Sequence, residues 1–127
     1  MFNQINSNFQ GNVGLGAAIA YFTKRGCPVC VPLTDSQAFD LVVGIDGILR
    51  KIQVKTTSYQ RKDRFQVDLR TKGGNRSGTG KTKKFLPCTI DYLFVLTSDN
   101  TCYLIPSTSL GGTGVISIGQ SYDQFRV

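Results

Sequence analysis

Asp40 and the run Gln53-Val54-Lys55 supply three chemical groups that could work together. Carboxylate and amide oxygens are ligands that Mg²⁺ accepts in proteins. A lysine ammonium can orient or deprotonate an attacking water, or stabilise charge on a phosphate. If the three side chains meet, Asp40 and Gln53 can hold Mg²⁺ while Lys55 acts at the reacting phosphate.

These side chains can meet only if two neighbouring strands carry them. The sequence predicts strands over residues 39–43 and 48–57, joined by Asp46-Gly47, a dipeptide typical of a two-residue hairpin turn. Such a hairpin brings Asp40 close to Gln53. Because side chains alternate along a strand, the amide and the ammonium project from one face, and the apolar residues beside them enter the core.

The rest of the chain predicts one helix before this hairpin and further strands after it. Residues 8–25 place apolar side chains at helical spacing, and Gly26 is suited to end the helix. The order predicts one domain over residues 1–127, built as an α+β or mixed α/β layer. Additional strands are expected over residues 27–31, 65–69, 92–96 and 102–105, with an exposed loop over 70–84 and at best weak strands after residue 105.

The positive charge is concentrated in one segment. Residues 50–84 contain twelve of the 15 Lys and Arg residues but two of the eight acids, so this segment carries +10 and the remainder −3. Such a concentration is typical of a protein that binds a polyanion, although a solvated loop that maintains solubility would give the same count. The expected DNA-contacting residues are Tyr59, Arg61, Lys62, Lys72, Arg76, Lys81, Lys83 and Lys84.

Several absences narrow the classes of function. The sequence contains no His and no Glu, so acid–base or metal chemistry depends on aspartates, lysines and neutral polar groups. No apolar run reaches the roughly 20 residues of a membrane span. Residues 1–10 lack the basic-then-apolar layout of a secretory signal. We therefore expect a cytoplasmic protein without membrane association, whose cysteines are reduced thiols.

Two other patterns have simpler explanations than the sites they suggest. Residues 78–82 read Gly-Thr-Gly-Lys-Thr, but Asn75 occupies the position of the first glycine of a P-loop. A four-thiolate zinc site is disfavoured because two of the four cysteines form no close pair and lie in apolar surroundings. We predict instead that all four are buried in strands: Cys27, Cys30, Cys88 and Cys102.

The spacing of Asp40 and Gln53-Val54-Lys55 resembles the metal-binding signature of PD-(D/E)XK nucleases, in the form with Gln in place of the second acidic residue. The flanking residues 24–26 and 35–43 also resemble a small prokaryotic branch of this family, which includes the homing endonuclease of a cyanobacterial group I intron. The resemblance covers roughly residues 10–105. It implies an α/β, restriction-endonuclease-like core with a central mixed sheet flanked by a helix.

The resemblance implies Mg²⁺-dependent, site-specific cleavage of double-stranded DNA. Asp40, Gln53 and the Val54 carbonyl would bind the metal, and Lys55 would be the catalytic ammonium. Because a small domain holds one active site and a duplex has two strands, a homo-oligomer, either dimer or tetramer, is implied. Two alternatives stay open: a nuclease that resolves Holliday junctions by recognising DNA shape, and a non-catalytic DNA-binding module on a decayed nuclease core.

One position departs from this branch. Its members usually carry Glu in the first helix, in a run such as Gly-x-x-Gly-Glu-Ala, and here Leu15 follows Gly14 at that place. The Glu would help to organise a metal ion or its water. With Leu15 there, Asp40 is left as the one carboxylate assigned to the site. The resemblance then implies impaired catalysis, deliberate inactivation, or another group in place of the Glu.

Overall fold

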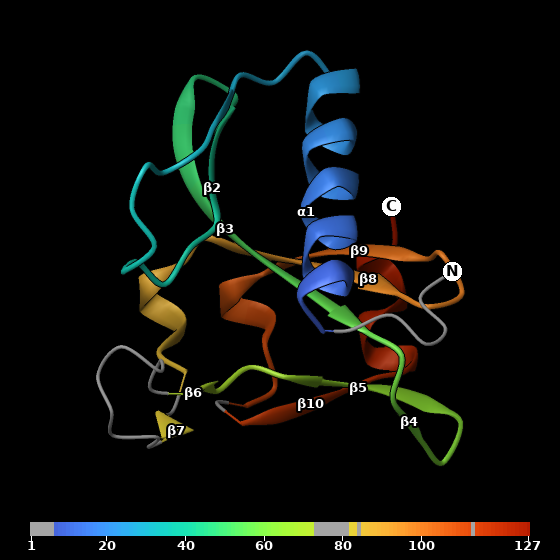
Figure 1. Ribbon diagram of the computed structural model, residues 1–127. Helices are drawn as coiled ribbons and strands as arrows, with labels where there is room; N and C mark the ends of the chain where they lie inside the picture. The colour runs from blue at the N-terminus through green and yellow to red at the C-terminus, as the bar shows by residue number, and fades with distance from the viewer. Residues whose placement is uncertain (1–6, 73–81, 84, 113) are drawn as a thin grey trace.

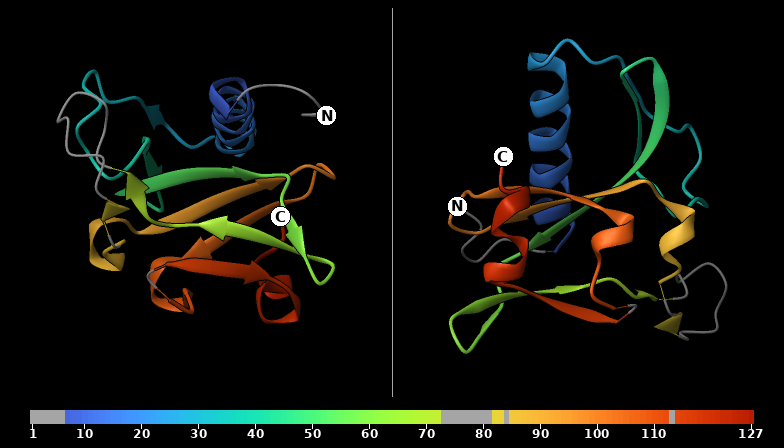
Figure 2. Two further views of the ribbon diagram at one scale, coloured as in Figure 1. Left: turned by 60° about the horizontal axis from the view of Figure 1, so that its bottom comes forward. Right: turned by 180° about the vertical axis from the view of Figure 1, so that it is seen from behind.

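A helix, a central sheet and a smaller sheet form three layers (Figure 1; Figure 2). The computed structural model describes residues 7–72, 82–83, 85–112 and 114–127. The helix, α1 (Ser7–Lys24), covers one face of the central sheet, and the smaller sheet covers the opposite face. This confirms the helix expected over residues 8–25. No helix among the described residues has the length and apolarity needed to cross a membrane.

The central sheet contains five strands in the order β1-β2-β3-β8-β9. β3 and β8 pair in parallel, and the other neighbours pair antiparallel. The predicted central mixed sheet flanked by a helix is therefore confirmed. Its strands are β1 (Val29–Cys30), β2 (Leu41–Ile45), β3 (Ile48–Thr57), β8 (Tyr92–Thr97) and β9 (Cys102–Pro106).

The smaller sheet has the order β10-β5-β4. The strand expected over residues 65–69 is confirmed as β5, with its ends shifted by one residue. Where the sequence predicts at best weak strands, β10 pairs with β5 over four residues, because Ile116 and Ile118 are buried in the core beneath it. The strands are β4 (Gln60–Arg61), β5 (Arg64–Asp68) and β10 (Val115–Ile118).

The prediction of a loop over residues 70–84 is wrong at the two ends that the structure describes. β6 (Thr71–Lys72) and β7 (Thr82–Lys83) pair antiparallel as a two-stranded sheet. The sequence does not predict this pair, because strands are predicted from alternating apolar residues and backbone pairing does not require them. Arg76, Lys81 and Lys84 lie outside the described residues. Short 3-10 helices follow at η1 (Pro87–Thr89), η2 (Ser107–Ser109) and η3 (Gln120–Phe125).

Each face of the central sheet packs against its own apolar core. Phe22, Leu41 and Phe94 belong to the core on the helix side, whereas Leu93 and Val95 pack against the smaller sheet. β8 therefore runs between two cores, and its residues after Tyr92 are all buried. A strand buried on both faces has a continuous apolar sequence, which is the signal that predicted it.

Two glycines set the geometry around the candidate site. Asp46 and Gly47 both adopt positive φ, 53° and 80°, as the two-residue turn between β2 and β3 requires, so the predicted hairpin is confirmed. Gly14 allows α1 to lie directly on β3, because a Cβ there would come within 2.2 Å of Thr56 Cγ2. This close approach brings the following residue, Leu15, to a pocket that Val54 of β3 also lines.

Candidate active site

Asp40 lies one residue before β2, where the pairing of β2 with β3 ends. Its N–H donates to the carbonyl of Ile52 at 2.8 Å, and Leu41 pairs with the same residue. Two consecutive residues thus oppose one residue of β3, which is the arrangement of a β-bulge and re-aims side chains beside functional sites. The Asp40 Oδ2 accepts a hydrogen bond from the N–H of Val54 at 2.7 Å.

Val54 also presents its carbonyl at this edge of the sheet. The N–H and C=O of one strand residue point to the same side, and the N–H of Val54 faces Asp40. β2 pairs with β3 as far as Ile52, so the Val54 carbonyl faces the edge that β2 leaves uncovered. A carboxylate and a carbonyl oxygen therefore lie at one edge, and both are ligands suited to Mg²⁺.

Lys55 follows on β3 and is half-buried. Burial lowers the pKa of Lys55 from its usual value, and the charges of Asp40 and Asp68 oppose this shift. Desolvation by the surrounding chain raises the pKa of Asp40, although the residue is exposed. The Val54 N–H and the charge of Lys55 lower that pKa by a smaller amount. Partly desolvated charged pairs of this kind cluster at functional sites.

Gln53 is buried in β3, with 6% of its surface exposed, and its Oε1 has no hydrogen-bond partner in the described part of the chain. A buried oxygen without a partner costs free energy, so its persistence calls for a ligand such as a cation or an ordered water. Gln53 adjoins Val54, but no hydrogen bond among the described residues joins it to Asp40. Its convergence with Asp40 on one ion stays a prediction.

Leu15 reaches the same region from α1. It is half-buried and lines a pocket together with Asp40 and Val54. The position at which the resemblance leads us to expect Glu therefore lines the same pocket as Asp40. Asn8 and Asn12 also line this pocket, and their helical spacing from Leu15 could have identified them. Asp35 lines it as well, but it lies in a loop whose path the sequence does not give.

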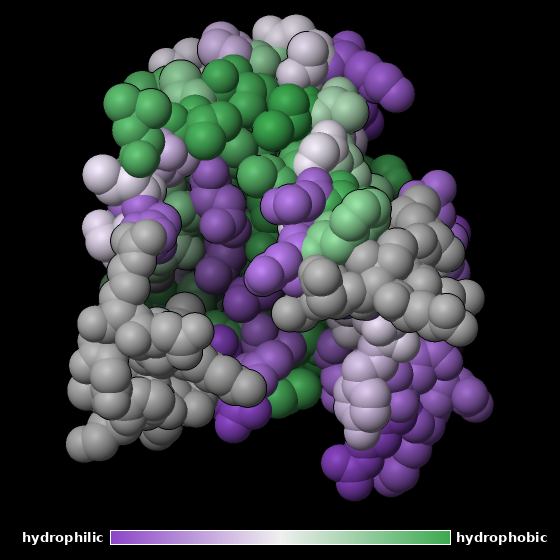
Figure 3. Space-filling view, in the orientation of Figure 1, coloured by the Kyte–Doolittle hydropathy of each residue, from purple (hydrophilic) through white to green (hydrophobic). Residues whose placement is uncertain are grey.

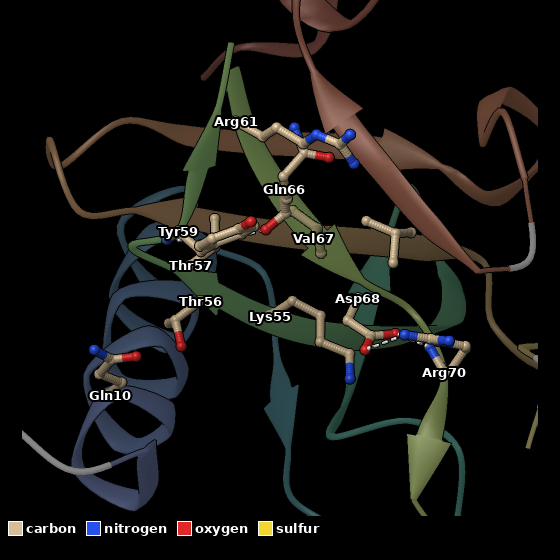
Figure 4. Close-up of a pocket in the computed structure, with 11 residues that line it drawn as sticks. Gln10, Lys55, Thr56, Thr57, Tyr59, Arg61, Gln66, Val67, Asp68 and Arg70 are labelled. Atoms are coloured by element: carbon tan, nitrogen blue, oxygen red, sulfur yellow. Dashed lines mark hydrogen bonds and ion pairs between the residues drawn. The ribbon is translucent and has the colours of Figure 1, made fainter. Parts of the chain in front are cut away.

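A second pocket opens at Lys55, between β3 and β5 (Figure 4). Two predicted DNA contacts, Tyr59 and Arg61, line it. Asp68 accepts hydrogen bonds from Nε and Nη2 of Arg70 at 2.9 and 3.0 Å at its rim. Gln66 and Asp68 are polar lining residues that the sequence did not lead us to expect. The alternation of polar and apolar residues along β5 could have identified them.

The other predicted DNA contacts are distributed over two hairpins. Lys62 lies in the turn between β4 and β5 and lines a third pocket with Arg61 and Arg64. Lys72 lies on β6 and Lys83 on β7. Figure 3 shows hydrophilic residues over the end of the molecule that carries β4, and apolar residues over the β2–β3 hairpin at the opposite end.

The cysteines do not behave as predicted. Cys30 and Cys88 are exposed, and the other two are partly buried, so the prediction of four buried strand cysteines is wrong. Cys30 lies in a two-residue edge strand and Cys88 in a short 3-10 helix, where little chain covers them. All four are free thiols. Within the described ranges, no three His, Cys, Asp or Glu side chains gather as a metal site.

Asp40→Asn should raise the melting temperature slightly at neutral pH. Because folding raises the pKa of Asp40, its protonated form contributes stability below the unfolded pKa, and this contribution is lost as the pH rises through the folded pKa. At neutral pH the folded wild type therefore carries a disfavoured charge. Asn carries none, yet its side-chain oxygen can still accept the Val54 N–H.

Thermal melts of both proteins in a metal-free buffer check this expectation. The difference in melting temperature should shrink as the pH approaches the ordinary pKa of Asp. A variant that melts below the wild type at neutral pH would show that the ionised carboxylate stabilises the fold, contrary to the assigned direction of the shift.

Comparison with known proteins bears on the family and the fold of this chain. Residues 5–118 match the family model described as PD-(D/E)XK endonuclease. A solved structure of a bacterial homing endonuclease, I-Ssp6803I, is similar with a TM-score of 0.75 and 22% sequence identity, over 95% of this chain and 88% of that chain. Among curated protein sequences, none matches. The structural likeness confirms the restriction-endonuclease-like fold, and the family model covers most of the sequence. The chain belongs to the PD-(D/E)XK endonuclease family.

Proposed function

We propose that this protein is a Mg²⁺-dependent endonuclease that cleaves double-stranded DNA at specific sites. It acts as a homo-oligomer, dimer or tetramer, of one catalytic domain over residues 1–127. The observation that supports this most is the Asp40 carboxylate, held at 2.7 Å by the Val54 N–H and close enough to Lys55 for each charge to shift the other's pKa. Leu15 leaves the site one carboxylate short, so catalysis is weaker than in relatives that carry Glu there.

The available oxygens fit a hard divalent cation. Asp40, Gln53 and the Val54 carbonyl would hold Mg²⁺, which supplies Lewis-acid activation of the phosphate and of the attacking water. The unpartnered, buried Oε1 of Gln53 supports its assignment as a ligand. The bulge at Asp40 and the hydrogen bond to Val54 fix the carboxylate against the backbone of β3, so little reorganisation is needed on binding.

Lys55 supplies the positive charge for the reaction. Its ammonium lies at the pocket between β3 and β5, where it can stabilise the charge that develops on a phosphate during hydrolysis. The lowered pKa of Lys55 also makes proton exchange with the attacking water easier near neutral pH. Asp68 supplies a second negative charge near this ammonium, and that charge opposes the lowering of the Lys55 pKa.

The basic segment supplies the contacts to DNA. We assign Tyr59 and Arg61, which line the Lys55 pocket, to the strand near the cut. The remaining contacts are assigned to the phosphate backbone and grooves on either side: Lys62, Lys72, Arg76, Lys81, Lys83 and Lys84.

Replacing Lys81, Lys83 and Lys84 together by Ala should flatten the salt dependence of DNA binding. Each lost phosphate contact removes about 0.9 from the slope of log affinity against log salt concentration. Fluorescence anisotropy on a labelled duplex at several salt concentrations gives the slope. Lys24→Ala, at the end of α1, is the control and should leave it unchanged. An unchanged slope in the triple variant would mean that these charges serve solubility.

A panel of DNA substrates tests the function itself. With Mg²⁺, the protein should cut a subset of a randomised linear duplex pool, and the cut sequences should share a common site. Symmetric cleavage of a synthetic four-way junction, with no preference among linear duplexes, would favour the junction-resolving alternative. Binding to DNA without cleavage of any substrate, even with Mg²⁺ in excess, would favour the non-catalytic DNA-binding module.

A further inference from the structure

The hairpin formed by β4 and β5 projects from the end of the molecule that carries the hydrophilic surface (Figure 1; Figure 3). Residues 58–64 are all exposed. Its turn consists of Lys62 and Asp63, both with positive φ, 53° and 62°, as in a tight two-residue turn. The hairpin is therefore a narrow antiparallel ribbon with side chains accessible on its surface.

Two arginines lie directly opposite each other on this ribbon. Arg61 pairs with Arg64 across the strands, and Lys62 follows in the turn. Like charges in this position destabilise a strand pair. The ion pairs among the described residues join Arg50 to Asp91 and Arg70 to Asp68, so none neutralises this cluster. The arrangement costs stability in the free protein, and a bound polyanion would offset that cost.

The neighbouring structure holds part of this cluster in place. Arg61, Lys62 and Arg64 line one pocket together with Gln66 and Ser117. Ser117 Oγ donates to Gln66 Oε1 at 2.9 Å, and Gln66 Nε2 donates to the Arg64 carbonyl at 3.0 Å. The Arg64 side chain lies against Gly119, the residue that follows β10, since a Cβ on Gly119 would come within 3.1 Å of its Nε. The arginine is thus supported by neighbours that belong to another strand.

This surface is continuous with the candidate active site. Arg61 and Gln66 line both the hairpin pocket and the Lys55 pocket. Figure 4 shows both side chains on the β4–β5 side of the pocket that contains Lys55. A duplex that places a phosphate at Lys55 would therefore bring its adjoining groove to the hairpin.

We propose that the β4–β5 hairpin enters the major groove of duplex DNA beside the cleavage site, with Arg61 and Arg64 contacting guanine edges and Lys62 a phosphate. The major groove admits a two-stranded β-ribbon, and the guanidinium group bonds O6 and N7 of guanine in a bidentate manner. The inference rests on the proposed nuclease function and deepens it, because it names the element that reads sequence near the cut.

Arg64→Ala and Arg64→Lys separate base reading from simple charge. Sites are selected from a randomised duplex pool by binding in Ca²⁺, and anisotropy gives the affinity for the best site. Arg64→Ala should weaken that affinity roughly tenfold or more and remove a guanine preference at one position. Arg64→Lys should weaken the guanine preference while keeping the wild-type salt slope, because an ammonium does not reproduce the planar fork of the guanidinium. Arg25→Ala, one residue after the end of α1 and outside the linings of the Lys55 and hairpin pockets, is the matched control.

Interference by methylated bases identifies the groove. Methylation of guanine N7 lies in the major groove and should block wild-type binding at the position that Arg64→Ala no longer discriminates. Wild-type site preference and affinity in both Arg64 variants would overturn the inference. So would interference from adenine N3 methylation, which lies in the minor groove, without interference from guanine N7. Melting temperatures close to the wild type ensure that lost binding does not reflect unfolding.

The hairpin inference and the proposed function can fail separately. If the wild type cuts DNA with Mg²⁺ but the Arg64 variants keep its site preference, the hairpin assignment is wrong and the nuclease stands. If binding depends on Arg64 but no substrate is cut, the hairpin assignment stands and the nuclease proposal is wrong. If the wild type binds no duplex, both are wrong.

Discussion

Asp40→Ala is expected to abolish Mg²⁺-dependent cleavage and to leave the affinity for duplex DNA largely unchanged. The carboxylate is the assigned metal ligand fixed by a backbone hydrogen bond, and its removal leaves two neutral oxygens for a doubly charged ion. Losing a group that acts mainly in the transition state lowers rates by factors on the order of 10²–10³ or more. DNA affinity depends instead on the basic segment, which the substitution does not touch.

Single-turnover cleavage and anisotropy on the same duplex measure the two quantities. Asp123→Ala is the control, because that exposed aspartate lies in η3 and lines none of the three pockets described above. Cleavage by Asp40→Ala at the wild-type rate would remove Asp40 from the mechanism. A parallel loss of DNA binding would instead show that the substitution disturbs the recognition surface.

Leu15→Glu is expected to raise Mg²⁺-dependent cleavage by something on the order of tenfold or more. The side chain lines the same pocket as Asp40 and Val54, so a carboxylate there can reach the proposed ion or its water. Mg²⁺ is usually held through carboxylates and substrate phosphates, and the wild-type site offers a single assigned carboxylate. The added charge therefore improves the site where it is poorest.

The same substitution should make stability depend on metal. Leu15 packs against the helix-side core, so Glu loses apolar contact and also faces the Asp40 charge. The variant should melt below the wild type in a chelator, and Mg²⁺ should recover part of the difference. Leu15→Gln is a control of similar shape without the charge, and it should not gain activity. An inactive Leu15→Glu whose melting temperature stays low with Mg²⁺ would show that Leu15 serves the core alone.

The local features of the site could be predicted from the sequence. The Asp46-Gly47 turn, the ten residues of β3 and the apolar β8 each carry a strong short-range signal. Together they predict that Asp40 lies near Gln53, and the structure places it within a hydrogen bond of the neighbouring Val54. Helical spacing places Leu15 on the sheet. Each of these predictions depends on residues close together in the chain, where turn chemistry and alternation are decisive.

The remaining features depend on contacts that pattern alone does not specify. The bulge at Asp40 arises from one hydrogen bond to Ile52, and no residue type in the sequence predicts that bond. β10 forms a strand because β5 is available to pair with it, more than 45 residues earlier in the chain. The exposure of Cys30 and Cys88 reflects the lack of cover over an edge strand and a short helix, which is a tertiary property.

We propose that position 15 and Asp40 belong to one metal site. The most direct measurement compares Mg²⁺-dependent cleavage by the wild type, Leu15→Glu and the double variant Leu15→Glu with Asp40→Ala, each with and without a chelator. We expect the gain from Leu15→Glu to require both Mg²⁺ and Asp40, so the double variant and the chelated samples should not cut. Cleavage by the double variant at the rate of Leu15→Glu, or cleavage that persists in the chelator, would contradict it.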